Sequence, residues 1–306
     1  MYSAQLIVLR AAHLAATILL AGIFTFNAVI PGGKGCDEPG ALHGIERRLF
    51  RVACWSLITA FVSWLLWCWL EVASMNSLPL KAAFARTAWQ PVLFDTLFGR
   101  VWLIRLSLIT GLFVLVALTL RKATQRRTPR RILWLLGMVC LGSLAWISHA
   151  AAAERDALGL GSDTLHLCAA GAWIGGLTPL AIFLSSPCAT GHGAIRVLRR
   201  FSTVSLCCVS ILLVSGISNS CLLLGSVHAL LTTPYGRLVL LKIILFAILV
   251  CLGGCNRFLI RRALPEQTDA MALSRLRFNV LCEVCLGAVV LIIAASLGVT
   301  PPARHL

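Results

Sequence analysis

Residues 6–30 read LIVLRAAHLAATILLAGIFTFNAVI, a run in which Arg10 is the one charged residue. A helix that crosses the hydrocarbon core of a bilayer needs roughly 20 apolar residues, because lipid offers the backbone no hydrogen-bond partners. No basic leader precedes this run, and it is too long for the apolar core of a signal peptide. We therefore interpret it as a membrane span that stays in the protein.

Seven further apolar runs follow, so the chain is predicted to cross the membrane eight times. Of its 306 residues, 59% are hydrophobic and 12% are charged, whereas a soluble domain carries roughly 25% charged residues. This composition excludes an ordinary soluble enzyme and predicts an all-α polytopic membrane protein with a single membrane domain. The eight runs are Leu6–Ile30, Leu49–Leu70, Val101–Leu120, Ile132–Ile147, Leu165–Leu184, Phe201–Leu224, Leu238–Cys255 and Phe278–Leu297.

The basic residues predict the orientation of the spans. The chain has 27 Lys and Arg against 11 Asp and Glu, a formal net charge of +16. They lie between apolar runs, where they set orientation in a bilayer, so we expect no nucleic acid partner. Eighteen of the 27 belong to the loops and flanks that follow spans one, three, five and seven. Because cytoplasmic loops are rich in Lys and Arg, both termini are predicted to lie outside the cytoplasm.

Two similarities between segments of the chain indicate an internal repeat. Residues 96–108 read TLFGRVWLIRLSL, and residues 233–245 read TPYGRLVLLKIIL. His13 and Gly22 of span one also correspond to His166 and Gly175 of span five. We expect two parallel four-helix halves, approximately residues 1–150 and 151–306, related by an axis along the membrane normal. Chance similarity between apolar helices is the alternative.

Three histidines are candidate metal ligands. By the predicted topology, His13 lies inside span one, His149 ends span four and His166 opens span five, all on the outer side. Ionisable residues at membrane depth are costly and often functional. Imidazole is a common ligand of copper, zinc, iron and nickel. The alternative is that each histidine caps a helix or bonds to a neighbouring carbonyl.

Two basic residues lie inside spans at the same position of the repeat. Arg105 and Lys242 each follow a Gly-Arg pair by five residues and sit in the outer half of a span. They can orient a counter-charge or repel cations from a wrong path. Alternatively, their long side chains reach up to the lipid headgroups.

Two further polar residues lie within spans. Asn219, in the outer part of span six, and Glu283, near the inner end of span eight, are expected to face protein and not lipid. Glu283 is predicted either to pair with Arg257 or Arg277 or to take part in cation passage.

The thirteen cysteines are scattered through the helices and do not indicate a disulfide framework. Cys251 and Cys255 share a face of span seven, and Cys282 and Cys285 share a face of span eight. If these helices are neighbours, the four thiolates can form an inner site for Cu(I). Buried cysteine is also an ordinary small apolar residue.

Several catalytic and cofactor motifs are absent. The sequence contains no G-x-x-x-x-G-K-[ST] loop for ATP, no H-E-x-x-H zinc motif and no C-x-x-C-H motif for covalent haem. Transport powered by its own ATP hydrolysis is therefore not expected, and neither is enzymatic activity.

Ordered motifs along the whole chain resemble the copper-resistance D family of bacterial inner-membrane proteins. The longest reads HLCAAGAWIGG at residues 166–176 and includes Trp173. A Ser at position 148 replaces the Gly that family members often have before the histidine of the fourth span. The remaining motifs are His149-Ala150, Arg200-Phe201-Ser202, Ser215-Gly216 with Asn219, Tyr235-Gly236-Arg237, Asn256-Arg257, and Glu283 with Leu286-Gly287.

The resemblance implies eight membrane helices in a bacterial inner membrane, both termini being periplasmic by the charge distribution. It also implies copper homeostasis, with a copper ion moved from periplasm to cytoplasm beside a soluble periplasmic copper-binding protein of the copper-resistance C type. The histidine motifs of the family correspond here to His13, His149 and His166, which we expect to form an outer copper site.

Two other functions fit the same features. A b-type cytochrome would use two histidines from facing helices as axial haem ligands. The cytoplasmic half of the membrane lacks histidines for a second haem, which disfavours electron transfer across the bilayer. A structural subunit that only docks the periplasmic partner is the third possibility.

Overall fold

Eight helices of the computed structural model are long and apolar enough to cross a membrane, which confirms the eight predicted spans. The structure describes residues 2–29, 39–121, 130–147, 157–190, 193–262 and 270–301, and this part of the chain contains no β-strand. The spanning helices are α1 (Ser3–Val29), α2 (Pro39–Met75), α4 (Leu97–Arg121), α5 (Arg130–Gly142) continued by η2 (Ser143–Ile147), α7 (Ala157–Leu184), α8 (Ala194–Leu224), α10 (Pro234–Arg262) and α11 (Ala270–Leu297).

Several spans extend beyond their apolar runs. Helix α2 begins at Pro39, ten residues before Leu49, because proline suits the first turn of a helix and polar residues continue the helix outside the hydrocarbon. The fourth span changes from α-helix to 3-10 helix at Ser143. Short helical segments join the spans: η1 (Ala82–Phe84), α3 (Arg86–Asp95), η3 (Pro187–Thr190) and α9 (Val227–Thr232).

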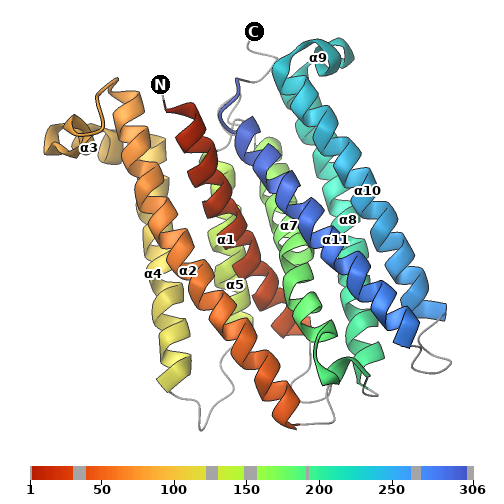
Figure 1. Cartoon of the computed structure of the whole chain (residues 1–306). Coiled ribbons are helices and arrows are strands. Elements are labelled where there is room, and N and C mark those ends of the chain that lie inside the picture. The colour runs from red at the N-terminus through yellow and green to blue at the C-terminus, as the bar shows by residue number, and fades with distance from the viewer. Residues whose placement is uncertain are drawn as a thin grey trace.

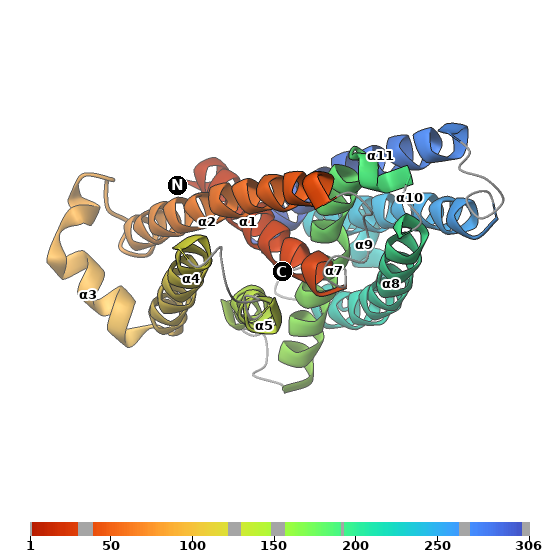
Figure 2. The same ribbon diagram turned by 90° about the horizontal axis from the view of Figure 1, so that it is seen from below.

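Both ends of the chain lie at one face of the bundle, together with α3 and α9 (Figure 1). We name this the termini face, and the opposite side the loop face. Figure 2 shows α1 and α7 in the centre, with α2 and α4 on one side and α8 and α10 on the other. Helix α11 packs against α1, α7 and α10.

The central helices α1 and α7 cross at glycines. A side-chain carbon at Gly22 would collide with the backbone of Gly175, and one at Gly175 would collide with the carbonyl oxygen of Ile18. Small residues at such a crossing let two backbones approach closely, which is how membrane helices gain packing contacts in lipid. The glycines that the repeat pairs in sequence therefore meet in space.

The repeated motif has the same local structure at both places. The Thr96 hydroxyl donates to the carbonyl of Val92 and accepts from the backbone N–H of Gly99 at 3.0 Å. The Thr233 hydroxyl donates to Ala229 and accepts from Gly236, also at 3.0 Å. Each threonine thus caps a spanning helix, α4 or α10, after a short helix at the termini face. Superposition of the two entire halves stays a prediction.

Candidate metal site

His13 is completely engaged within the first half. Its side chain, 1% exposed, lies between α2 and α4. Nδ1 lies 3.0 Å from the carbonyl oxygen of Ala60 and 3.2 Å from the Ser63 hydroxyl, while Nε2 lies 2.7 Å from the Arg105 guanidinium. A carbonyl can only accept and a guanidinium can only donate. Nδ1 therefore carries the proton, and the lone pair of Nε2 is occupied.

Arg105 does not reach up to the headgroups but is enclosed by protein, with 0% exposure. Its guanidinium donates to the Cys140 carbonyl and, at 2.6 Å, to the Ser143 hydroxyl. The guanidinium carbon lies 4.7 Å from the ring centroid of Trp64, a cation–π arrangement. Nε has no hydrogen-bond partner among the described residues. Arg105 therefore joins α1, α4 and α5 through one buried charge.

His166 in the second half has the same tautomer, but its Nε2 has no hydrogen-bond partner among the described residues. Its Nδ1 lies 2.9 Å from the Ser215 hydroxyl, which itself donates to the carbonyl of Ile211 at 2.6 Å. Because that hydroxyl proton is used, Nδ1 of His166 is the donor to Ser215. No described residue hydrogen-bonds to Nε2, and the ring is half-buried. Nε2 thus presents a lone pair, and a hydrogen bond at the other nitrogen is how proteins orient metal-binding histidines.

Further polar residues surround His166 toward the termini face. The amide of Asn219 donates to the carboxylate of Asp163 over 3.3 Å, and Ser162 donates to the Asn219 side-chain oxygen over 2.9 Å. The ammonium of Lys242 lies within electrostatic range of both Asp163 and His166. Asn219 therefore faces protein, as expected, and Lys242 lies near a counter-charge, one of the two alternatives for this residue. Asp163 and His166, three residues apart on α7, share a helix face.

The predicted three-histidine site is not assembled by the described residues. His13 contacts α2 and α4, whereas His166 contacts α8, so the two imidazoles face different helices. His149 lies outside the described residues. No group of three or more His, Cys, Asp or Glu side chains placed to hold a metal ion occurs in the described part of the chain. Of the two described candidates, His166 is the one whose Nε2 has no hydrogen-bond partner among the described residues.

Glu283 pairs with an amide and not with an arginine. Its carboxylate, 2% exposed, accepts from Asn256 over 3.2 Å, and Asn279 donates to the Asn256 side-chain oxygen over 2.9 Å. We name these three residues the amide cluster. The expected pairing with Arg257 or Arg277 is wrong, because the arginine side chains extend to other helices.

The two arginines bond to the backbone near the loop face. Arg257 donates to the carbonyl and the hydroxyl of Ser202, at 3.2 and 3.0 Å. Arg277 donates to the carbonyl of Leu184 at 2.5 Å. These guanidinium groups hold the ends of neighbouring helices together and leave the Glu283 carboxylate to the amides.

Trp173 lies between His166 and the amide cluster. It is 2% exposed, and its ring centroid lies 6.2 Å from that of Phe246 in an edge-to-face arrangement. A side-chain carbon at Gly253 would lie 3.5 Å from the Glu283 carboxylate and 4.0 Å from the Trp173 ring. Seven residues separate His166 from Trp173, about 10 Å along a helix. Trp173 therefore lies two turns from His166 along α7 and close to Glu283, between two polar regions of the second half.

The four cysteines of the predicted inner site are not gathered. Cys251, Cys255 and Cys285 are exposed on the outside of the bundle, and Cys282 is half-buried. Exposed positions on spanning helices face lipid, where thiols behave as small apolar groups. Cys188 in η3 is disulfide-bonded, a pairing that the scattered cysteines gave no ground to expect.

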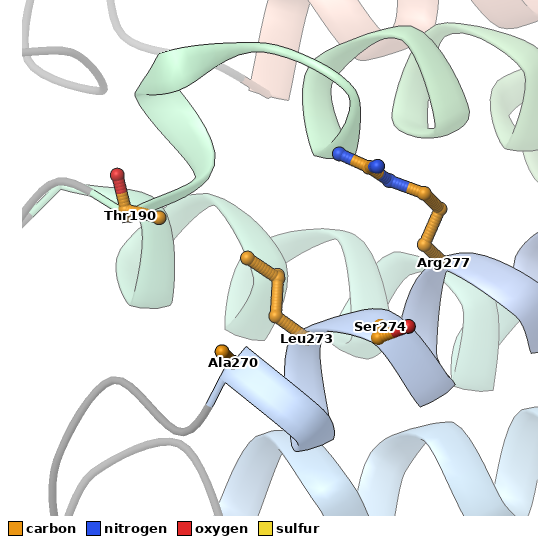
Figure 3. A pocket seen from close by; sticks show the side chains of 5 residues that line it. All are labelled: Thr190, Ala270, Leu273, Ser274 and Arg277. Atoms are coloured by element: carbon orange, nitrogen blue, oxygen red, sulfur yellow. The ribbon is translucent and has the colours of Figure 1, made fainter.

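A small pocket opens at the loop face between η3 and α11. Thr190, Ala270, Leu273, Ser274 and Arg277 line it, as Figure 3 shows. Among the described residues, its lining offers one guanidinium and no imidazole, thiol or carboxylate.

Sequence reasoning missed the hydroxyl groups and tryptophans that hold the histidines. Ser63 and Ser215 bond to the two Nδ1 atoms, and Trp64 and Trp67 lie against His13 with ring centroids 4.9 and 5.8 Å away. One signal was present: the serines are 152 residues apart and the histidines 153. Small polar residues are common in membrane helices, so this spacing stood out only once the contacts were known.

Comparisons with known proteins place these features in a family. The model of the family described as copper resistance protein D matches residues 195–297. The model described as copper resistance protein D-like, N-terminal domain, matches residues 1–160. Together the two models cover most of both halves.

Three known proteins are similar to this chain in sequence. The chain is 29% identical over 283 residues to copper resistance protein D of Pseudomonas syringae pv. tomato, covering 86% of this chain and 89% of that protein. It is 34% identical over 224 residues to inner membrane protein YebZ of Escherichia coli, covering 72% and 73%. It is 31% identical over 188 residues to copper transport protein CutJ of Bacillus subtilis, covering 58% of this chain and 34% of CutJ. No solved structure matches the chain.

Proposed function

This chain belongs to the copper resistance protein D family. On this basis, we propose that it carries copper ions from the periplasm to the cytoplasm. It is a multi-pass membrane protein of copper homeostasis, and we assign it to the bacterial inner membrane. The termini face is periplasmic in this proposal, because 18 of the 27 basic residues belong to the loops and flanks of the loop face. The copper ion is cargo, and no chemical conversion is involved.

Copper reaches the protein from a soluble periplasmic copper-binding protein of the copper-resistance C type. The acceptor is Nε2 of His166, on a half-buried ring in the half of α7 nearer the termini face. Imidazole binds copper without the very tight hold of a full thiolate set, so the ion can move on. Asp163 adds a carboxylate on the same helix face.

A single observation supports passage through the protein: two polar regions at different depths lie in the same half. His166 and Asp163 occupy the upper level, and Glu283 with its amides occupies the lower one. Polar groups inside spans are costly and commonly mark ion pathways. Trp173 and Phe246 lie between the levels and would have to move during transport.

Copper uptake by cells that express the protein tests the direction of transport. Expression should raise cellular copper, measured by mass spectrometry, and His166→Ala should abolish most of the rise, a loss of about 10-fold or more. His228→Ala is the matched control, because His228 is exposed on α9 at the same face. A fall in cellular copper on expression would contradict import, and an unchanged rise in His166→Ala would contradict the role of His166.

A further inference from the structure

The same three kinds of side chain meet in each half of the bundle. His13, Ser63 and Arg105 form the first-half cluster, and His166, Ser215 and Lys242 form the second-half cluster. The offsets between corresponding residues are 153 for the histidines, 152 for the serines and 137 for the basic residues. In both clusters Nδ1 bonds to the serine on the following spanning helix, so Nε2 carries the lone pair.

In the first-half cluster, the lone pair on Nε2 of His13 accepts a hydrogen bond from the Arg105 guanidinium, which is a cation. Nη2 of Arg105 lies 2.7 Å from Nε2 of His13, and the remaining bonds of the guanidinium go to Cys140 and Ser143. A guanidinium keeps its charge in proteins and cannot leave, unlike a metal ion. The position next to Nε2 of His13 is therefore permanently filled.

In the second-half cluster, no described side chain hydrogen-bonds to the corresponding nitrogen, Nε2 of His166. Lys242 replaces Arg105 and donates no hydrogen bond to Nε2 of His166 among the described residues. The residues one turn before the two histidines also differ in charge between the halves. At an offset of 153, Asp163 stands where the first half has Arg10. This half thus has an acidic group one turn from its histidine where the first half has a basic one, with the Lys242 ammonium within electrostatic range of both.

Asn219 also differs from its first-half counterpart. At an offset of 152, it stands where the first half has Trp67, and its amide bonds to Asp163. Trp67 instead closes the first-half cluster, with its ring centroid 5.8 Å from that of His13 and 5.1 Å from that of Trp64. The first-half cluster is thus packed with tryptophan rings, whereas the residues at the corresponding positions of the second-half cluster carry oxygen and nitrogen atoms.

We propose that the two halves have separate roles: the first-half cluster is a permanent structural site, in which Arg105 occupies the cation position on His13, and the second-half cluster alone binds copper, on Nε2 of His166. This inference rests on the proposed function and deepens it. It limits the route of the ion to the helices α7, α8, α10 and α11. It also removes His13 from the copper ligands.

Matched substitutions test the assignment in the purified protein. Cu(I) affinity is measured under anaerobic conditions by competition with a chromogenic chelator. His166→Gln should weaken the binding by about 10-fold or more, whereas His13→Gln should change it by less than about 2-fold. Glutamine keeps an oxygen that can accept from Arg105, so the first half retains its hydrogen bond. The reverse pattern would overturn the inference, as would equal losses in both variants.

A second measurement follows the copper ligands in the unsubstituted protein, and the variants serve only to assign its signals. The ring nitrogens of ¹⁵N-labelled histidines are followed by NMR while Cu(I) is added, with the His166 signals assigned from the His166→Gln spectrum. Nε2 of His166 should shift and that of His13 should not. A shift of the His13 signal would refute the permanent role of Arg105. Failure of copper uptake in cells would instead refute transport and leave this result standing.

Discussion

Asn256 donates the hydrogen bond that Glu283 accepts, over 3.2 Å from Nδ2 to Oε1, and no described basic side chain forms an ion pair with this carboxylate. A buried carboxylate without a cation is costly, and the cost falls when a cation comes near. A role of this carboxylate in cation passage is therefore a prediction that a substitution can test.

Replacing Glu283 by Gln should abolish most copper transport while the protein keeps its fold. Glutamine has the same shape and can still accept from Asn256, but it lacks the charge that attracts a cation. Copper uptake into proteoliposomes and thermal unfolding in detergent measure the two effects. Glu71→Gln serves as the control, because Glu71 is a half-buried acid that accepts from Trp67 on the same helix. Normal uptake by Glu283→Gln would rule out a role of its charge.

Replacing Gly175 by Ala should destabilise the protein by about 1–3 kcal/mol or more, because the added carbon collides with the backbone of α1 at Ile18. Gly254→Ala should be close to neutral, since no heavy atom outside its own helix lies within 4 Å of the added carbon. Unfolding in detergent with increasing denaturant compares the two variants. Equal stability would show that α1 and α7 do not cross at this glycine.

The orientation of the termini face can be tested by labelling. Val227 at the start of α9 is 82% exposed, so a cysteine placed there should react in intact spheroplasts with a membrane-impermeant maleimide. A cysteine in place of Glu46, exposed near the loop face, should react only after lysis. The native exposed cysteines are first replaced by Ser. The opposite labelling pattern would reverse the topology and the proposed direction of uptake.

Removing the hydroxyl of Thr96 or of Thr233 should have similar effects, because each caps the spanning helix that follows it. Thr→Ala at either position should cost about 0.5–2 kcal/mol of stability. Thr232→Ala is the control, since its hydroxyl donates to a carbonyl of its own short helix and caps no span. If one of the two substitutions were neutral and the other costly, the repeated motif would not have the same role in both halves.

The number of spans could be predicted from the order of residues along the chain. A bilayer sets the length of an apolar run, and the run itself lies in one continuous segment, so all eight appear without knowledge of packing. The motif around Gly99 and Gly236 could also be found, because its capping bonds join residues three or four positions apart.

The state of each polar group depends on helix rotation and on contacts between distant segments. Arg105 reaches His13 across 92 positions of the chain, and Asn256 reaches Glu283 across 27. Rotating one helix about its axis by the angle of a single residue would change these partners. In a span that is hydrophobic on all sides, the apolar pattern does not define this rotation. For this reason the sequence pointed equally to His13 and His166, while the packed helices engage Nε2 of His13 and give Nε2 of His166 no hydrogen-bond partner among the described residues.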